Sequence, residues 1–192
     1  RTKNRHFALL GHLLAGATAS LSLPPLFLLP AIFALSIPLL AYLKAQSRMQ
    51  ASMIFGMAGI GWFLASTYWV SHSLIVETPS LWGLAPFMAL ALSLVLALFW
   101  ASAAMVSWSF GRRPVARLFW FVAFFSLGEW ARGFVATGFP WNLTGSLFAV
   151  DLASLQVASV IGVYGLCVTA LLFALVPAFW VLGHWRFAAI FL

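Results

Sequence analysis

The charged residues of this chain are confined to a few short clusters, and the stretches between the clusters are long and almost entirely apolar. About 20 consecutive apolar residues are enough for an α-helix to cross the hydrocarbon core of a bilayer. Hydrophobic residues make up 64% of the sequence and charged residues 7%, a balance that excludes a soluble domain of this size. The sequence therefore predicts an all-α integral membrane protein, built as a polytopic helical bundle.

Six complete spans and the start of a seventh are predicted, all within a single transmembrane domain over residues 1–192. Pro24 and Pro25 separate the first two spans, because proline cannot continue a helix. The fourth span is long and is expected to tilt or break near Pro86. Residues 71–80 are predicted as a loop. The predicted spans cover about 7–23, 26–43, 51–70, 81–108, 115–130 and 155–182, and a truncated seventh begins at 187.

The first apolar run has a second interpretation. Basic residues precede it, and Ala17-Thr18-Ala19 near its end is typical of a signal-peptide cleavage site. Either a first span or a cleaved signal peptide fits these features. Both interpretations place the N-terminus in the cytoplasm.

The positions of the lysine and arginine residues predict the orientation of the bundle. With the N-terminus in the cytoplasm, nine of the ten fall on the cytoplasmic side, as the positive-inside rule requires, and Arg132 is the exception. The net charge of +7 is thereby explained without a nucleic-acid partner. Eight of the ten tryptophans fall near predicted span ends, where interfacial belts form, and Trp62 and Trp100 lie well inside. The nine cytoplasmic cations are Arg1, Lys3, Arg5, Lys44, Arg48, Arg112, Arg113, Arg117 and Arg186.

One segment, residues 128–145, combines an acid, a base and several glycines in an otherwise apolar chain. Glu129 and Arg132 are three residues apart, which places them on the same face of a helix. Gly138 and Pro140 then end that helix. The charged pair is therefore predicted at the outer end of the fifth span.

Two interpretations of this pair remain open at this point. Charges are costly near hydrocarbon, so Glu129 and Arg132 could neutralise one another and fix the loop to its helix. Alternatively, Arg132 could bind a lipid phosphate or carboxylate while Glu129 orients it. The turn that follows could likewise be a rigid corner, with Trp141 in the membrane interface, or the wall of a groove that admits lipid.

Other chemistry-bearing residues give weaker indications. Cys167 lies near the centre of the sixth predicted span, where a thiolate would be desolvated with no cation beside it. His12 is predicted to be a hydrogen-bonded packing residue of the first span. His72 and Glu77 share the predicted loop after the third span, and two such residues make a poor metal site. Because known catalytic motifs are also missing from the sequence, we expect no catalytic residue, metal or other cofactor here.

Several sequence blocks, in this order, resemble the membrane region of the apolipoprotein N-acyltransferase family. The resemblance extends over most of the chain. It rests on Glu129-Trp-Ala-Arg132-Gly133, Thr137-Gly138-Phe139-Pro140-Trp141-Asn142, Gln156 and Gly162-Val-Tyr-Gly165-Leu166, with weaker similarity at Leu23-Pro24-Pro25, Trp62 and Tyr68-Trp69-Val70-Ser71.

The resemblance implies a bacterial inner-membrane enzyme of lipoprotein biosynthesis. Members of this family transfer an acyl chain from a phospholipid to the N-terminal diacylglyceryl-cysteine of a lipoprotein, through an acyl-enzyme thioester. Their chemistry belongs to a periplasmic nitrilase-like domain with a Glu-Lys-Cys triad, which lies after a seventh span and is absent from this sequence. The chain is therefore expected to position the two lipid substrates and to be inactive alone.

The resemblance also implies the partners, the location and the site. The expected partners are a phospholipid acyl donor, a diacylated lipoprotein acceptor and membrane lipids. The chain is expected in the inner membrane with the Gly133–Val150 loop in the periplasm. A small transporter that uses the charged pair for coupling, or a non-catalytic scaffold, are the alternatives. The candidate lipid-lining residues are Glu129, Arg132, Gly138, Phe139, Pro140, Trp141 and Asn142.

Overall fold

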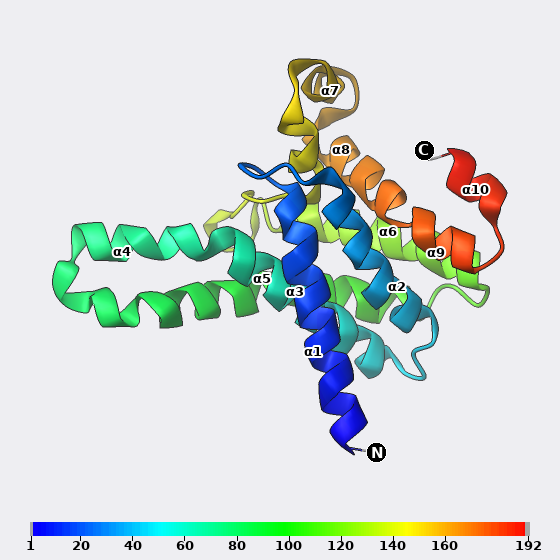
Figure 1. Cartoon of the computed structure of the whole chain (residues 1–192), viewed down its shortest axis with the longest axis horizontal. Helices are drawn as coiled ribbons and strands as arrows, with labels where there is room; N and C mark the ends of the chain where they lie inside the picture. Colours follow the sequence, from blue (N-terminus) through cyan, green and yellow to red (C-terminus); the bar gives the residue numbers. More distant parts are fainter. Residues whose placement is uncertain (1, 191–192) are drawn as a thin grey trace.

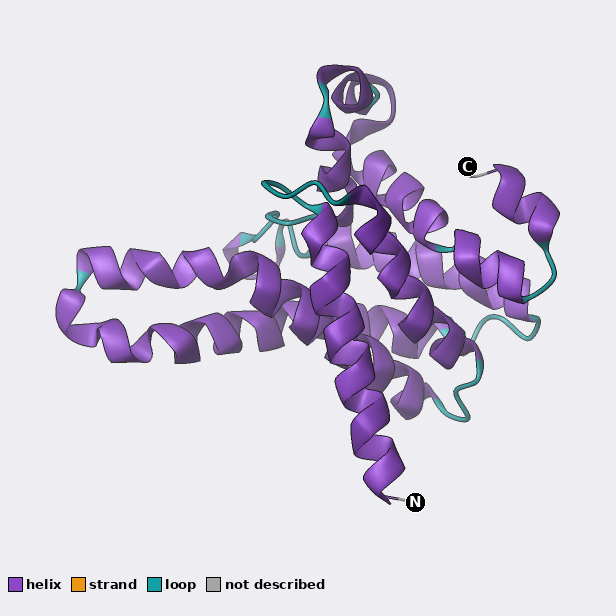
Figure 2. Cartoon of the chain, in the orientation of Figure 1, coloured by secondary structure: helices purple, strands orange, loops and turns teal. Residues whose placement is uncertain are grey.

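The structure, a computed structural model, describes residues 2–190, and within that range every regular element is a helix (Figures 1 and 2). The all-helical class predicted from the apolar runs is thereby confirmed. The α-helices are α1 (Thr2–Ala19), α2 (Ser36–Leu43), α3 (Arg48–Thr67), α4 (Ser71–Glu77), α5 (Ala85–Ser107), α6 (Pro114–Ala131), α7 (Leu152–Gln156), α8 (Ala158–Ala174), α9 (Val176–Val181) and α10 (Trp185–Ile190). The 3₁₀ helices are η1 (Ser20–Ser22), η2 (Leu29–Leu35), η3 (Tyr68–Val70), η4 (Pro79–Leu84), η5 (Val135–Thr137) and η6 (Thr144–Val150).

Three helical stretches are long and apolar enough to cross a membrane, at Arg48–Glu77, Pro79–Ser107 and Ala158–Val181. They correspond to the third, fourth and sixth predicted spans. The other three predicted spans coincide with α1, with η2 and α2 together, and with α6. These segments are helical but are shorter or carry charged residues within their bounds. The structure therefore shows an all-helical fold with three helices that could cross a membrane by length and composition, and the count of six spans stays a prediction.

The loop predicted over residues 71–80 is wrong, because most of it is helical. Ser71 to Glu77 forms α4, which continues the α3 helix through η3. No glycine or proline interrupts this stretch, and the chain turns only at Thr78, which precedes Pro79. The helices on either side form a long hairpin that projects from the bundle (Figure 1). His72 and Glu77 therefore lie on a helix and not in a turn.

The sixth predicted span is also interrupted. Gly162 has φ +71°, which breaks the helical path inside α8, and a second break at Leu175 separates α8 from α9. Pro177 lies in the first turn of α9, where a missing N–H costs nothing. Pro86 occupies the same place at the start of α5, where η4 passes into α5, and the expected tilt or break near it stays a prediction.

The third predicted span contains a cluster of three glycines, Gly56, Gly59 and Gly61, and such small residues predict close packing of helix backbones. A Cβ at Gly61 of α3 would lie 1.9 Å from the backbone oxygen of Leu13 in α1, and a Cβ at Gly16 of α1 would lie 1.9 Å from that of Ala58. Only glycine allows backbones to approach this closely, which is how helices associate in lipid. On its other side α3 packs against α5, which in turn packs against α6.

An aromatic core fills the space between α2, α3, α5 and α6. Tyr42, Phe55 and Phe121 contact one another, with ring centroids 4.2 to 5.9 Å apart. The Tyr42 hydroxyl also forms a 2.8 Å hydrogen bond with Ser107 Oγ. This packing joins α2, α3 and α6, and the Tyr42–Ser107 bond adds α5.

The predicted start of a seventh span at residues 187–192 lies mostly within α10, which ends at Ile190. Residues 191 and 192 lie outside the described range. Among the residues described, α10 is a six-residue helix that follows α9 after Gly183.

Candidate functional site

The site is built on a buried ion pair at the end of α6. Arg132 Nε donates to Glu129 Oε1 at 2.9 Å, and Arg132 Nη2 donates to Glu129 Oε2 at 3.3 Å. Both side chains are 0% exposed. The two hydrogen bonds form the bidentate geometry that a guanidinium and a carboxylate favour. The contact predicted from the spacing of the two residues is confirmed.

The guanidinium also holds the turn that follows the helix. Arg132 Nη1 donates to the backbone oxygens of Phe139 and Trp141, both at 2.7 Å, and Phe139 N donates to the Arg132 backbone oxygen at 2.7 Å. A guanidinium carries five N–H groups, and four of them are directed to acceptors within the protein. Its Cζ lies 5.2 Å from the centre of the Phe63 ring, in cation–π contact. Arg132 therefore connects α6, α3 and the turn.

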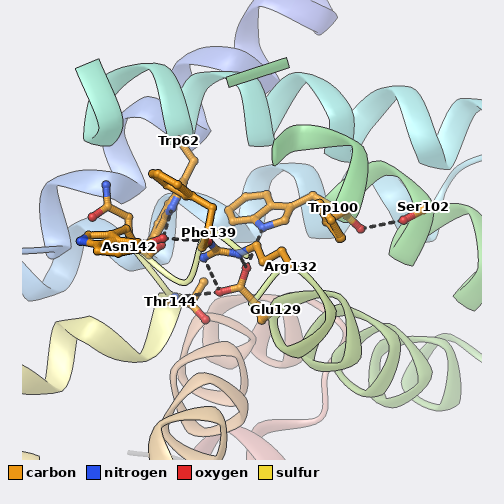
Figure 3. Close-up of polar contacts among 10 residues, drawn as sticks. Trp62, Trp100, Ser102, Glu129, Arg132, Phe139, Asn142 and Thr144 are labelled. Atoms are coloured by element: carbon orange, nitrogen blue, oxygen red, sulfur yellow. Dashed lines mark hydrogen bonds and ion pairs between the residues drawn. The ribbon is translucent and has the colours of Figure 1, made fainter. Parts of the chain in front are cut away.

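Two further donors satisfy the Glu129 carboxylate. Trp100 Nε1 of α5 donates to Oε1 at 3.3 Å, and the backbone N–H of Thr144 donates to Oε2 at 3.1 Å. Figure 3 shows the carboxylate between these donors and the guanidinium. A buried carboxylate is stable only when it is paired and hydrogen-bonded. Glu129 thus joins the start of η6 and the centre of α5 to the same ion pair.

Asn142 fixes the far end of the turn to α3. Its Nδ2 donates to the Ser66 backbone oxygen at 2.6 Å, and its own backbone oxygen accepts from Trp62 Nε1 at 3.3 Å (Figure 3). Asn142 has φ +54°, in the left-handed region that asparagine tolerates better than most residues. The Trp62 and Trp100 rings pack 5.3 Å apart, so the two indoles form one support beneath the turn.

A run of left-handed backbone precedes the turn. Ala136, Thr137 and Gly138 have φ of +53°, +74° and +82°. Alanine and the β-branched threonine rarely adopt this conformation, and it persists only where the surroundings impose it. The bonds from Arg132 to the next residues supply that constraint. Such conformations concentrate at ligand sites, which directs attention to the space beside this segment.

A largely apolar cavity of about 520 Å³ lies between α5 and this strained segment. The α5 side is a row of aliphatic and aromatic side chains, and the opposite wall is η5 with the start of the turn. Its polar lining residues are Ser102, Arg132 and Thr137. The lining residues are Leu92, Val95, Leu96, Leu98, Phe99, Ser102, Arg132, Val135, Ala136, Thr137, Gly138 and Phe139.

The structure places the predicted candidates in four different positions. Arg132, Gly138 and Phe139 line the cavity. Glu129 lies behind Arg132, and Asn142 anchors the turn to α3. The remaining two, Pro140 and Trp141, are exposed on the outside of the turn.

Sequence reasoning missed four residues that build the site: Trp62, Phe63, Trp100 and Thr144. The two tryptophans carried a signal, since they alone lie away from the predicted span ends, and both are almost completely buried. The Thr144 contribution comes from its backbone, which no side-chain pattern reveals. The α5 wall of the cavity carried no signal, because a uniformly apolar helix does not indicate which face meets a cavity.

The possible metal ligands and the single cysteine of residues 2–190 can also be placed. No group of three His, Cys, Asp or Glu side chains in that range is placed to hold a metal ion. Cys167 is completely buried in α8. A Cβ at Gly145 would lie 2.7 Å from the Cys167 backbone nitrogen, so η6 packs directly on this part of α8.

Comparison with known proteins assigns the chain to a family. The family model of the apolipoprotein N-acyltransferase N-terminal domain matches residues 15–176. This chain belongs to the apolipoprotein N-acyltransferase family. Three similar relatives carry the name apolipoprotein N-acyltransferase. That of Caulobacter vibrioides is 35% identical over 175 residues, which are 90% of this chain and 33% of the relative.

The other two relatives match this chain with similar identity and similar coverage. The apolipoprotein N-acyltransferase of Rickettsia bellii is 35% identical over 154 residues, 80% of this chain and 31% of the relative. That of Brucella melitensis is 32% identical over 185 residues, 89% of this chain and 34% of the relative. The chain thus spans about a third of the length of the relatives that it matches.

The blocks that carried the resemblance to apolipoprotein N-acyltransferases meet in space. A Cβ at Gly133, which ends the first block, would lie 2.6 Å from the Tyr164 hydroxyl of the last block. Gly162 opens that last block with φ +71°, a conformation that favours glycine. The blocks therefore describe one packed corner formed by α6, the turn and α8.

Proposed function

We propose that this chain is the membrane portion of an apolipoprotein N-acyltransferase and that its cavity holds an acyl chain of a lipid substrate. The observation that carries the proposal is the 520 Å³ cavity, whose walls are mostly apolar and whose few polar lining residues are Ser102, Arg132 and Thr137. A lipid chain gains little hydrophobic energy on leaving the bilayer for an apolar cavity, so the cavity acts by packing and orientation.

The buried pair has a positioning role in this proposal. Because four N–H groups of Arg132 are engaged within the protein, the guanidinium fixes the cavity wall rather than gripping a phosphate. Because both side chains of the pair are completely buried, the structure gives less support to a transporter in which Glu129 and Arg132 form a coupling pair. The transfer from phospholipid to the lipoprotein amino group would be carried out by the nitrilase-like domain that the family resemblance implies.

A photo-crosslinking experiment tests the cavity directly. The chain is placed in nanodiscs that contain a phospholipid with a photoactivatable acyl chain, and the labelled peptides are mapped. Labelling is expected on α5 and on residues 135–139. Val95→Trp, which fills the cavity from an exposed position, is expected to reduce this labelling about 10-fold, equivalent to about 1.4 kcal/mol.

Leu94→Trp is the matched control, since Leu94 is exposed on the same helix and does not line the cavity. Equal labelling of the two tryptophan variants and the unaltered chain would show that acyl chains do not occupy this cavity.

The proposed location is the bacterial inner membrane, with the N-terminus in the cytoplasm and the loop at residues 133–150 in the periplasm. Support comes from the asymmetry of lysine and arginine. A cysteine introduced at the exposed Ala149 is expected to react with an impermeant thiol reagent in intact spheroplasts, on a background with Cys167 replaced. A cysteine at Ser109, which is exposed between α5 and α6, should react only after lysis. The reverse pattern would refute the orientation.

A further inference from the structure

A second cavity, of about 250 Å³, lies between α1, α2 and α3, in a part of the molecule that the proposed function does not use. Its polar lining comes from His12 of α1, Lys44 at the end of α2 and Gln50 of α3. The remaining lining residues are apolar: Ala8, Leu9, Ala41, Met53 and Ile54. No acidic side chain is among these lining residues.

His12 is the first indication that the cavity takes a ligand. The residue is only 8% exposed, and its Nδ1 atom is buried without a hydrogen-bond partner in residues 2–190. The hydrogen-bonded packing role predicted for His12 is therefore not fulfilled at this nitrogen. Buried polar atoms are nearly always satisfied, and an exception requires a specific reason such as a bound molecule. The cavity that His12 lines offers the space for one.

Lys44 and Gln50 supply further hydrogen-bond donors at the same place. Lys44 is exposed. It forms no ion pair in the described part of the chain, where the only such pair joins Arg132 to Glu129. Gln50 Oε1 already accepts from Gln46 N at 2.9 Å, so the unused groups of this amide are its N–H donors. Lys44 is the one charged residue among those that line the cavity. The cavity thus combines donors and positive charge.

We propose that this cavity binds a phosphate group, as carried by the headgroup of an anionic phospholipid or by free inorganic phosphate. The tetrahedral oxygens would accept hydrogen bonds from Lys44 Nζ, Gln50 Nε2 and His12 with its proton on Nδ1. Basic pockets between transmembrane helices bind anionic headgroups in the same way. The apolar walls at Leu9 and Ile54 would contact the glycerol and the first carbons of an acyl chain.

The cavity volume agrees with this ligand class. A water molecule occupies about 30 Å³ in the liquid, so 250 Å³ corresponds to about eight water molecules. That space accommodates a phosphodiester with part of its glycerol but not an entire phospholipid. The acyl chains would extend into the surrounding bilayer.

The test measures lipid retention and thermal stability of the whole chain. The chain is purified in phosphatidylcholine nanodiscs and supplemented either with phosphatidylglycerol or with inorganic phosphate. Phosphatidylglycerol is expected to remain bound in native mass spectrometry and to raise the Tm, because a ligand that binds only the folded state stabilises it. Lys44→Gln is expected to reduce retention at least 5-fold, and His12→Gln by a similar factor.

Matched controls separate this site from general attraction to anionic lipid. His6 is exposed on the same helix, and Arg186 is an exposed cation elsewhere, so His6→Gln and Arg186→Gln should retain phosphatidylglycerol fully. Lys44→Gln alters an exposed side chain and is expected to fold, which keeps the test valid if His12→Gln does not. If inorganic phosphate raises the Tm and phosphatidylglycerol does not, and if Lys44→Gln abolishes that rise, the site binds free phosphate. Equal retention in all four variants, or no effect of either ligand, would overturn the proposal.

Discussion

Replacing Arg132 with methionine is expected to lower the free energy of unfolding by about 3 to 5 kcal/mol, because removal of one partner of a buried ion pair leaves the other charge uncompensated. The carboxylate of Glu129 would keep only the donors Trp100 and Thr144. The turn would also lose both hydrogen bonds from Nη1 to Phe139 and Trp141. Denaturant unfolding in a fixed detergent measures the change.

Arg112→Met provides the control for this variant, since Arg112 is exposed in the loop between α5 and α6. An isolated surface charge contributes little to stability, on the order of 0 to 1 kcal/mol. A similar unfolding free energy for Arg112→Met and Arg132→Met would mean that the pair does not support the fold. That result would instead favour the alternative interpretation, in which Arg132 binds a lipid phosphate.

Gly138→Ala is expected to displace the turn and to destabilise the chain by more than about 3 kcal/mol, since it combines backbone strain with a steric clash. Gly138 has φ +82°, and a Cβ there would lie 2.2 Å from the Gly133 backbone oxygen. The Phe139 N–H to Arg132 oxygen bond adjoins this contact and would break. Unfolding measurements, together with faster proteolysis at residues 133–150, report the change.

Gly162→Ala separates the two causes. Gly162 has a similar φ of +71°, but a Cβ there would meet nothing within 4 Å. This variant should show only the backbone contribution, about 1 to 3 kcal/mol, and should leave proteolysis of the turn unchanged. Equal effects of the two substitutions would indicate that the contact with Gly133 does not constrain the turn.

The features that the sequence predicted well are those determined by local spacing. Glu129 and Arg132 pair because residues three apart share a helix face. The glycines of α3 indicated close packing for a similar reason, since only the absence of a side chain permits it.

The features that the sequence predicted wrongly, or did not predict, depend on contacts and competition between segments. Residues 71–77 were predicted as a loop from their polar composition, yet the helix continues because nothing in them breaks it. The sixth span was predicted as continuous, although Gly162 departs from helical geometry inside α8. The cavity itself depends on how α5 faces residues 135–139, a contact between distant parts of the chain that periodicity does not reveal.

A double-mutant cycle between Glu129 and Arg132 tests most directly the claim that this buried pair holds the corner together. Unfolding free energies are compared for the unaltered chain, Glu129→Gln, Arg132→Met and the double variant. Contacting buried residues show coupling of about 0.5 to 3 kcal/mol, and we predict about 2 kcal/mol or more, with the double variant more stable than Arg132→Met alone. Additive effects, with coupling near zero, would contradict the account.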